Sequence, residues 1–306
     1  MTDLTVQAPV PHIGVCICTY RRTQMLRRVL QEVSRQKTDG LFTLSVVVAD
    51  NDVARSAEAV VAEFQSKSTI QVIYCVEERQ NIARARNKAI QNASGDYLAF
   101  IDDDEFPACT WLLELFKTCT AYHVDGVLGP VLRHFDEKPP RWLEKSQFYV
   151  RRVNPTGMPV EWQDARTGNV LLKRMVIGDD PAPFRPEFRA GEDQDFFRRK
   201  ITLGLKFVWC AQAEVFESVP PARWKRKYLL RKALLRGATA GLHTSVMSIV
   251  KSMIAVPLYS LALPFAFVAG QHHFMTLMVK ICDHLGKLFI LVGINVIQEE
   301  YVLDGL

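Results

Sequence analysis

The sequence predicts an α/β fold in which helices flank a mostly parallel sheet. In the first third of the chain, short apolar runs alternate with segments whose apolar residues recur at helical spacing. Such alternation is typical of βαβ units, in which successive strands run parallel. The expected strands are apolar on nearly every residue, as in a sheet that is covered on both faces.

Strands and helices are expected in strict alternation in this part of the chain. The strands are expected at residues 13–19, 44–49, 70–76 and 97–101. Leu26, Val29, Leu30 and Val33 recur at helical spacing and indicate the first helix, and the next two helices are expected at residues 54–64 and 82–92.

The pattern loosens from residue 125 onward, where prolines and aromatic residues interrupt the regular runs. Antiparallel strands are expected at residues 126–134 and 168–172. A helix is expected at residues 192–203, because the acidic residues at its start suit the positive end of a helix dipole.

Polar clusters follow three of the expected strands at the point where each strand ends. Residues 19–22 end the first strand, residues 50–52 the second and residues 102–105 the fourth. The carboxyl ends of parallel strands meet at one edge of an open sheet, where ligands bind. We therefore expect the three clusters to converge on one crevice.

The third cluster is acidic, with Asp102, Asp103 and Asp104 directly behind an apolar strand. Adjacent carboxylates repel one another, and gathering them costs free energy unless a cation offsets their charge. Magnesium and manganese ions prefer carboxylate oxygen together with phosphate oxygen. The run therefore predicts a divalent-metal site that holds the diphosphate of a nucleotide.

Five short motifs occur in the order and at the approximate spacing of a known family. They are Cys18-Thr19-Tyr20-Arg21, Val48-Ala49-Asp50-Asn51, Ala85-Arg86-Asn87, Gly95-Asp96-Tyr97 leading into Phe100-Ile101-Asp102-Asp103-Asp104, and Gly191-Glu192-Asp193. With them the chain resembles family 2 glycosyltransferases of the Rossmann-like GT-A fold over residues 13–205. Thr167-Gly168-Asn169 and residues 217–236 add a looser likeness to bacterial exopolysaccharide enzymes of the succinoglycan type. The resemblance implies a hexosyltransferase of bacterial surface-polysaccharide biosynthesis.

The resemblance also implies roles for the residues at matching positions. The nucleoside pocket would be lined by Thr19, Tyr20 and Asp50. The rest of the donor site would comprise Arg22, Asp52, Arg86, Asn87, Asp102 and Asp103. Asp104, together with Asp102, would bind Mn²⁺ or Mg²⁺, and Asp193 would be the general base. Acceptor contacts would come from Asn169, Glu192 and Trp224.

An inverting transfer gives these roles a chemical reason. A carboxylate removes the proton of the acceptor hydroxyl while the diphosphate leaves from the opposite face of the sugar. The base and the metal must therefore lie on opposite sides of the sugar, and Asp193 opens a different element from the strand behind Asp102. Glu192 and Asp195 are candidates for raising the pKa of the base.

Two arginines near the start of the helix expected at residues 82–92 compete for a ligand contact. Arg84 and Arg86 are two residues apart and cannot share one helix face. Arg86 stands in the family-like triplet, so it is the arginine expected at the ligand.

The last third of the chain is first basic and then apolar. Residues 223–236 are rich in Lys and Arg, residues 252–269 carry no charge, and residues 274–297 are apolar with sparse charges. The basic stretch suits anionic lipid headgroups on the cytoplasmic side of a membrane. The uncharged run, about 27 Å long as a helix, is just long enough to span a bilayer. An interfacial hairpin and a buried helical pair remain open as alternatives.

These features divide the chain into three predicted parts. Residues 1–12 form a polar tail without the apolar core of a signal peptide. Residues 13–220 form a catalytic domain, with a nucleotide-binding half at 13–124 and an acceptor-binding half at 125–220. Residues 221–306 form a helical region at the cytoplasmic face of the cell membrane, attached peripherally or through a hairpin.

Composition fits small anionic partners better than nucleic acid. Lys and Arg number 38 against 33 Asp and Glu, a net charge of +5 that suits a nucleotide diphosphate or an acidic membrane face. No nucleic-acid-binding motif is recognisable. The seven cysteines show no CxxC spacing and suit a reducing compartment. The expected partners are a UDP-sugar donor and a lipid-linked or saccharide acceptor.

Two other classes of protein also gather carboxylates beside magnesium. A phosphatase of the DxDxT type would need Thr or Val four residues after its first Asp, and Phe106 stands at that position. A phospho-acceptor receiver domain, which is not an enzyme, would need its acidic pair after the first strand, which ends in Thr19 and Tyr20. Both classes remain alternatives to the transferase.

Overall fold

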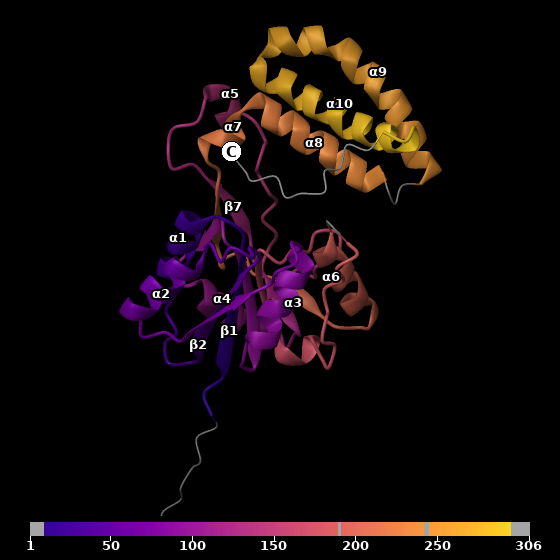
Figure 1. Ribbon diagram of the computed structural model, residues 1–306. Coiled ribbons are helices and arrows are strands. Elements are labelled where there is room, and N and C mark those ends of the chain that lie inside the picture. The colour runs from indigo at the N-terminus through magenta and orange to yellow at the C-terminus, as the bar shows by residue number, and fades with distance from the viewer. Residues whose placement is uncertain (1–8, 189–190, 242–244, 295–306) are drawn as a thin grey trace, which may run out of the picture. The chain divides into compact units, whose positions relative to one another are not determined.

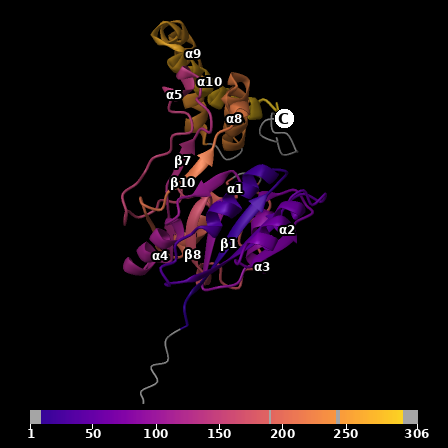
Figure 2. The same cartoon turned by 90° about the vertical axis from the view of Figure 1, so that its left-hand side faces the viewer.

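The structure is a computed structural model, and it describes residues 9–188, 191–241 and 245–294. The chain forms two compact units, whose helices and strands are drawn in Figures 1 and 2. The first unit comprises Met1–Arg133 and Arg151–Ser218, and the second unit comprises His134–Val150 and Val219–Leu306. The two units are defined by packing and not by function. The predicted boundary at residue 220 between a catalytic domain and a membrane region therefore stays a prediction.

A seven-stranded sheet forms the centre of the first unit, in the order β3-β2-β1-β4-β8-β6-β9. Its strands are β1 (His12–Thr19), β2 (Thr43–Asp50), β3 (Val72–Val76), β4 (Tyr97–Asp102), β6 (Gly126–Leu128), β8 (Asn169–Lys173) and β9 (Phe207–Trp209). The first four strands run parallel, and β9 is parallel to β6. Only β8 is antiparallel to its neighbours within this sheet. The predicted α/β class with a mostly parallel sheet is confirmed.

A three-stranded sheet adjoins the end of β4. Its order is β5-β10-β7, and its strands are β5 (Glu105–Pro107), β10 (Val215–Ser218) and β7 (Val131–His134). The acidic run therefore lies where the chain leaves the large sheet and enters the small one.

Both faces of the large sheet are buried, which explains its apolar strands. Along β1, Val15 and Ile17 pack into one hydrophobic cluster, whereas Cys16 and Cys18 pack into another. The first cluster includes residues of α1 (Thr23–Ser34), α2 (Glu58–Lys67) and α4 (Trp111–Ala121). The second includes residues of α3 (Ile82–Asn92) and α6 (Glu192–Thr202). A short 3₁₀ helix, Arg174–Val176, follows β8.

Some elements differ from the sequence prediction, two of them for a local reason. Helix α2 begins at Glu58 rather than at residue 54, because Asp50 Oδ2 accepts a hydrogen bond from Ala57 N at 2.8 Å and holds the preceding residues as a turn. The strand expected at residues 126–134 is two strands, β6 and β7, because the chain changes sheets at Gly129. A Cβ there would lie 2.3 Å from Ala213 O. Helix α4 was not predicted.

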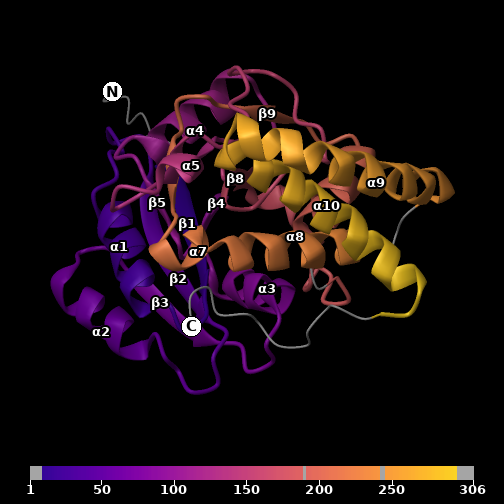
Figure 3. The same cartoon turned by 90° about the horizontal axis from the view of Figure 1, so that it is seen from above.

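The second unit is helical in its described residues. Its helices are α5 (Arg141–Glu144), α7 (Pro221–Trp224), α8 (Arg226–Gly241), α9 (Val246–Ala269) and α10 (Gln271–Leu291). Helix α10 packs against both α8 and α9, as Figure 3 shows. The close approach of α10 to α8 requires a glycine at position 286, because a Cβ there would lie 2.2 Å from Leu234 O.

Helix α9 is, within the described part of the chain, the one helix long and apolar enough to cross a membrane. It starts six residues before the predicted uncharged run and continues through Pro257 and Pro264. The apolar run predicted at residues 274–297 corresponds to α10, and its last three residues lie outside the described residues.

Candidate functional site

A pocket of about 500 Å³ opens in the first unit at the carboxyl ends of the central strands. Asp102 at the end of β4, Leu128 at the end of β6 and Trp209 at the end of β9 all line it. Asp193 of α6 and Arg86 of α3 line the same pocket. The fold thus brings together residues that lie up to 107 positions apart and that the sequence assigned to donor binding and base catalysis.

The acidic run alternates between buried and accessible carboxylates. The side chain of Asp102 is 44% exposed, whereas Asp103 and Glu105 are buried. Desolvation raises the pKa of Asp102; Arg86 lowers it, and the carboxylate of Asp104 raises it further. Asp102 and Asp104 are therefore close enough to repel each other, and Asp102 faces the pocket.

Asp103 fastens the end of β1 to the acidic run. It accepts hydrogen bonds from Thr19 Oγ1 at 2.7 Å and from Arg22 Nη1 at 2.9 Å. Burial raises the pKa of Asp103 to about 6, although Arg22 opposes the shift. Asp103 thus contacts both Thr19 and Arg22, and all three are predicted donor-binding residues.

Asp50 orders the loop that follows β2. It is fully buried, and its oxygens accept hydrogen bonds from Ala57 N, from Tyr74 Oη at 2.9 Å and from Asp52 N at 3.1 Å. These bonds explain why an aspartate ends this strand. The predicted contact between Asp50 and the nucleoside base stays a prediction.

Asp52 is held by an arginine from the end of β1. Arg21 Nε donates to Asp52 Oδ2 at 3.0 Å and Nη2 to Oδ1 at 3.3 Å, and the guanidinium lies 5.0 Å from the centre of the Tyr20 ring. The hydrogen bond from Arg21 lowers the pKa of Asp52. Arg21 has φ of 55°, a strained value for a residue with a Cβ. The contacts with Asp52 and Tyr20 help to offset that strain.

Helix α3 carries two predicted donor residues, and both contact the chain near α6. The buried Arg86 forms an ion pair with the buried Glu192, and its Nη2 lies 3.7 Å from Asp102 Oδ1. Asn87 exchanges two hydrogen bonds with the backbone of Phe184, at 2.7 and 3.0 Å. Arg86 therefore links the acidic run to the start of α6, and Asn87 fixes the segment before that helix. Arg84 is partly buried, and the expectation that Arg86 is the arginine at the ligand stays a prediction.

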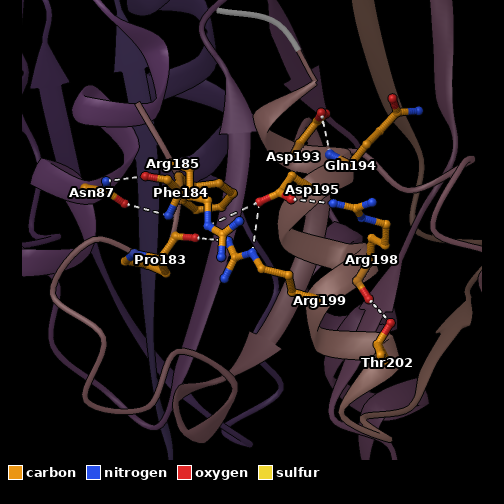
Figure 4. A network of polar contacts seen from close by, with 10 residues as sticks. All are labelled: Asn87, Pro183, Phe184, Arg185, Asp193, Gln194, Asp195, Arg198, Arg199 and Thr202. Carbon is orange, nitrogen blue, oxygen red and sulfur yellow. Dashed lines mark hydrogen bonds and ion pairs between the residues drawn. The ribbon is translucent and has the colours of Figure 1, made fainter. Parts of the chain in front are cut away.

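Asp193 is the second residue of α6, and its carboxylate turns away from the arginine cluster that follows it (Figure 4). Its Oδ1 accepts a hydrogen bond from Gln194 N at 2.8 Å. Asp195 instead pairs with Arg198 at 3.1 Å and Arg199 at 2.8 Å. Arginine thus offsets the charges of both Asp195 and Glu192, and the expected influence of these two acids on the base stays a prediction.

Asn169 and Trp224, the other residues predicted to contact the acceptor, make internal hydrogen bonds. The buried amide of Asn169 accepts from Trp111 Nε1 at 2.7 Å and donates to the carbonyls of Pro130 at 2.9 Å and Ala213 at 2.7 Å. It therefore fixes the start of β8. Trp224 belongs to the second unit, where its indole nitrogen donates to Val219 O at 2.8 Å.

Two polar residues of the site received no individual role from the sequence: Glu105, which was placed only within the acidic cluster, and Arg151, which was missed. Glu105 is buried and accepts a hydrogen bond from Asp102 N at 3.2 Å, and burial raises its pKa well above the usual range. A Cβ on Gly168 would lie 2.6 Å from Glu105 Oε1, so the glycine makes room for this acid. Arg151 lines the pocket and pairs with Glu217 at 2.7 Å. Arg151 follows a stretch without periodic pattern, so no sequence signal connects it with Asp102.

The donor atoms of the acidic run fit a magnesium or manganese ion that is shared with a nucleotide. Asp102 and Asp104 offer carboxylate oxygens only, the ligand type that these ions prefer. Among the described residues, no three His, Cys, Asp or Glu side chains are grouped so as to hold an ion by themselves. Two carboxylates with phosphate and water as the remaining ligands are typical of ions that bind together with a nucleotide.

Comparisons with known proteins show the family of the chain. The profile described as "Glycosyl transferase family 2" matches residues 14–202, more than half of the chain. The succinoglycan biosynthesis protein ExoM of Rhizobium meliloti is 32% identical over 75% of this chain and 74% of its own length. The glycosyltransferase AglE of Haloferax volcanii is 30% identical over 65% of this chain and 64% of its own length.

Solved structures show the same fold. The mannosyltransferase PcManGT of Pyrobaculum calidifontis, in complex with GDP-Man and Mn²⁺, superposes with a TM-score of 0.61 at 15% identity, covering 92% of this chain and 88% of that one. TarS 1–349 of S. aureus in complex with UDP gives a TM-score of 0.52 at 14% identity, and the superposition covers 96% of this chain and 95% of TarS 1–349. The chain has the GT-A fold, and the phosphatase and receiver-domain alternatives are set aside. From the profile match and the relationship to ExoM, the chain belongs to glycosyltransferase family 2 and is a hexosyltransferase.

Proposed function

We propose that the protein is an inverting hexosyltransferase that moves a sugar from a UDP-sugar to a lipid-linked or saccharide acceptor in surface-polysaccharide biosynthesis. One observation carries the proposal. Asp102, at the end of a central strand, and Asp193, at the start of α6, line one pocket. A direct displacement needs a leaving-group site and a base within reach of one sugar.

The residues at the acidic run act on the donor, and Asp193 acts on the acceptor. Arg86, buried beside Asp102, stabilises negative charge at the diphosphate. Thr19, Arg22 and Asp103 hold the end of β1 beside the acidic run. Tyr20 and Asp50 border the nucleoside, and Asp52 borders the diphosphate. A divalent ion held by Asp102 and Asp104 would supply positive charge for the leaving diphosphate. Asp193 accepts the proton of the acceptor hydroxyl, and Glu192 positions α6 through its pair with Arg86.

Thermal unfolding with a panel of nucleotide sugars tests the donor class. UDP and one UDP-sugar are expected to raise the Tm when Mn²⁺ is present, because ligands that bind only the native state stabilise it. GDP-mannose and ADP-glucose, which carry other nucleobases, serve as controls for recognition of uracil. If no nucleotide diphosphate raised the Tm with either Mn²⁺ or Mg²⁺, the proposed function would be wrong.

We also propose that α9 attaches the protein to the cytoplasmic face of the cell membrane. Many of its outward side chains are apolar, with Leu261 72% and Phe265 78% exposed. Ser252 points inward, because it is buried and its Oγ lies 2.9 Å from His284 Nδ1 of α10. A helix on a water-exposed surface buries its apolar side chains and exposes its polar ones. The exposed apolar side chains of α9 instead suit a helix that faces lipid.

The neighbours of α9 favour an orientation along the membrane surface. Helix α10 packs against α9 and carries Lys280, Asp283 and Lys287 from its middle onward. Carrying such residues to the centre of a bilayer costs about 2.5–3.5 kcal/mol each. A helix that lies in the interface buries its apolar face and leaves these charges near water.

Replacing Leu261 and Phe265 by Asp is expected to reduce binding to anionic lipid vesicles at least about tenfold, because the apolar area that enters the membrane is lost. Co-sedimentation with phosphatidylglycerol vesicles measures this effect. Met175→Asp, which alters an exposed apolar residue of the first unit, is the matched control and is expected to bind like the wild type. Equal binding of the double variant and the control would contradict this attachment.

A further inference from the structure

Two irregular segments of the pocket lining have no role in the proposed reaction. Residues 151–154 and 164–167 each contribute several polar side chains to the lining. Their charged residues are Arg151, Arg152 and Arg166 against a single acid, Asp164. This part of the pocket therefore carries a surplus of positive charge. It adjoins the start of α6, because Gln194 Nε2, next to Asp193, donates to Gln163 O at 2.7 Å.

Two of the three arginines are available to a ligand. Arg151 is paired with Glu217. Arg152 and Arg166 are exposed at the pocket and form no ion pair with any described residue. Arg166 Nη1 donates to the carbonyls of Gln163, at 2.9 Å, and Ala165, at 2.5 Å. These neutral partners hold the guanidinium in place and leave its charge uncompensated.

Two buried polar groups in the same segments lack partners. Thr167 is 1% exposed and Asn154 is 5% exposed, and both residues line the pocket. Thr167 Oγ1 and Asn154 Oδ1 have no hydrogen-bond partner among the described residues. A buried polar atom without a partner costs about 1–3 kcal/mol. The Thr167 hydroxyl can donate to an oxygen-rich anion, directly or through an ordered water, whereas Asn154 Oδ1 can accept from such a water or from a sugar hydroxyl.

We propose that these segments form a subsite for a negatively charged group on the acceptor, a carboxylate or a phosphate. Guanidinium groups bind both anions through paired N–H···O bonds. The group belongs to the acceptor because Arg152 and Arg166 share the pocket with Asp193, which must reach the acceptor hydroxyl. The diphosphate of the donor is instead met by Arg86 and the metal site at the acidic run. This subsite rests on the proposed function.

Calorimetric titration of the protein saturated with UDP and Mn²⁺ tests the subsite. The probes are methyl β-D-glucuronide for a carboxylate, glucose 6-phosphate for a phosphate, and methyl β-D-glucoside as the neutral match. At least one anionic probe is expected to bind about tenfold more tightly than the glucoside, the effect of one charge-assisted contact of about 1.4 kcal/mol. The probe that shows this preference identifies the anion.

The double variant Arg152→Gln/Arg166→Gln is expected to abolish this preference and to leave UDP affinity unchanged. Arg27→Gln/Arg35→Gln removes the same charge from exposed positions in α1 and directly after it, outside the pocket, and is expected to keep the preference. Equal affinity for all three probes in the wild type would overturn the subsite. A double variant that lost UDP affinity would also overturn it, by assigning these arginines to the donor. Failure of the wild type to bind UDP would contradict the proposed function itself.

Discussion

Asp193→Asn is expected to lower the rate of sugar transfer by about 10²–10⁴-fold, the usual contribution of a general base. UDP affinity is expected to stay unchanged, because the donor residues lie on other elements. The amide keeps the size of the side chain and can still accept the hydrogen bond from Gln194 N. Transfer from a radiolabelled UDP-sugar to a membrane fraction measures the rate, and calorimetry measures the affinity.

Asp164→Asn is the matched control, because Asp164 is an exposed aspartate that lines the same pocket. It is expected to keep most of the transfer activity. If Asp193→Asn transferred sugar at the wild-type rate, the assignment of the base would be wrong. If Asp164→Asn lost activity instead, the base would be Asp164.

Arg86→Ala is expected to lower the free energy of unfolding by about 3–5 kcal/mol. The substitution leaves Glu192, which is 5% exposed, without the arginine that compensates its charge. It also removes the link between the acidic run and α6, so transfer is expected to fall as well. Urea unfolding followed by circular dichroism measures the stability.

Two variants separate the ion pair from the loss of a long side chain. Arg84→Ala shortens a partly buried arginine of the same helix and is expected to cost less than about 1 kcal/mol. Arg86→Met/Glu192→Leu removes both charges and is expected to recover much of the stability, since apolar replacements of a buried pair are often neutral. An Arg86→Ala variant as stable as Arg84→Ala would show that the pair is not needed for folding.

The sequence predicted the parallel half of the fold well because its signals there are local. The strands are buried on both faces and are therefore apolar along their length, and polar residues mark the point where each strand ends. Helix α3 was predicted with its observed bounds, and Asn81, whose side chain accepts from Arg84 N at 3.1 Å, caps its start. Such patterns can be read without knowledge of distant contacts.

The sequence could not predict which site residues contact the ligand and which hold other residues in place, because this depends on contacts between residues far apart in the chain. Thr19 lies 84 residues from its partner Asp103, and Arg86 lies 106 residues from Glu192. Sequence patterns also cannot separate ligand contacts from internal ones. Asn87 and Asn169 stand in family-like motifs, yet their amides fix the backbone around the pocket. The pocket arginines follow irregular segments, where spacing carries no information.

The central claim is that one pocket holds the leaving diphosphate at the acidic run and the base at Asp193. Calorimetric titration of UDP against the wild type, Asp104→Asn and Asp193→Asn, with and without Mn²⁺, tests it most directly. We expect tight, Mn²⁺-dependent binding by the wild type and by Asp193→Asn, and loss of the Mn²⁺ dependence in Asp104→Asn. UDP binding that is equally tight in all three proteins without Mn²⁺ would contradict the account, because the acidic run would then take no part in holding the donor.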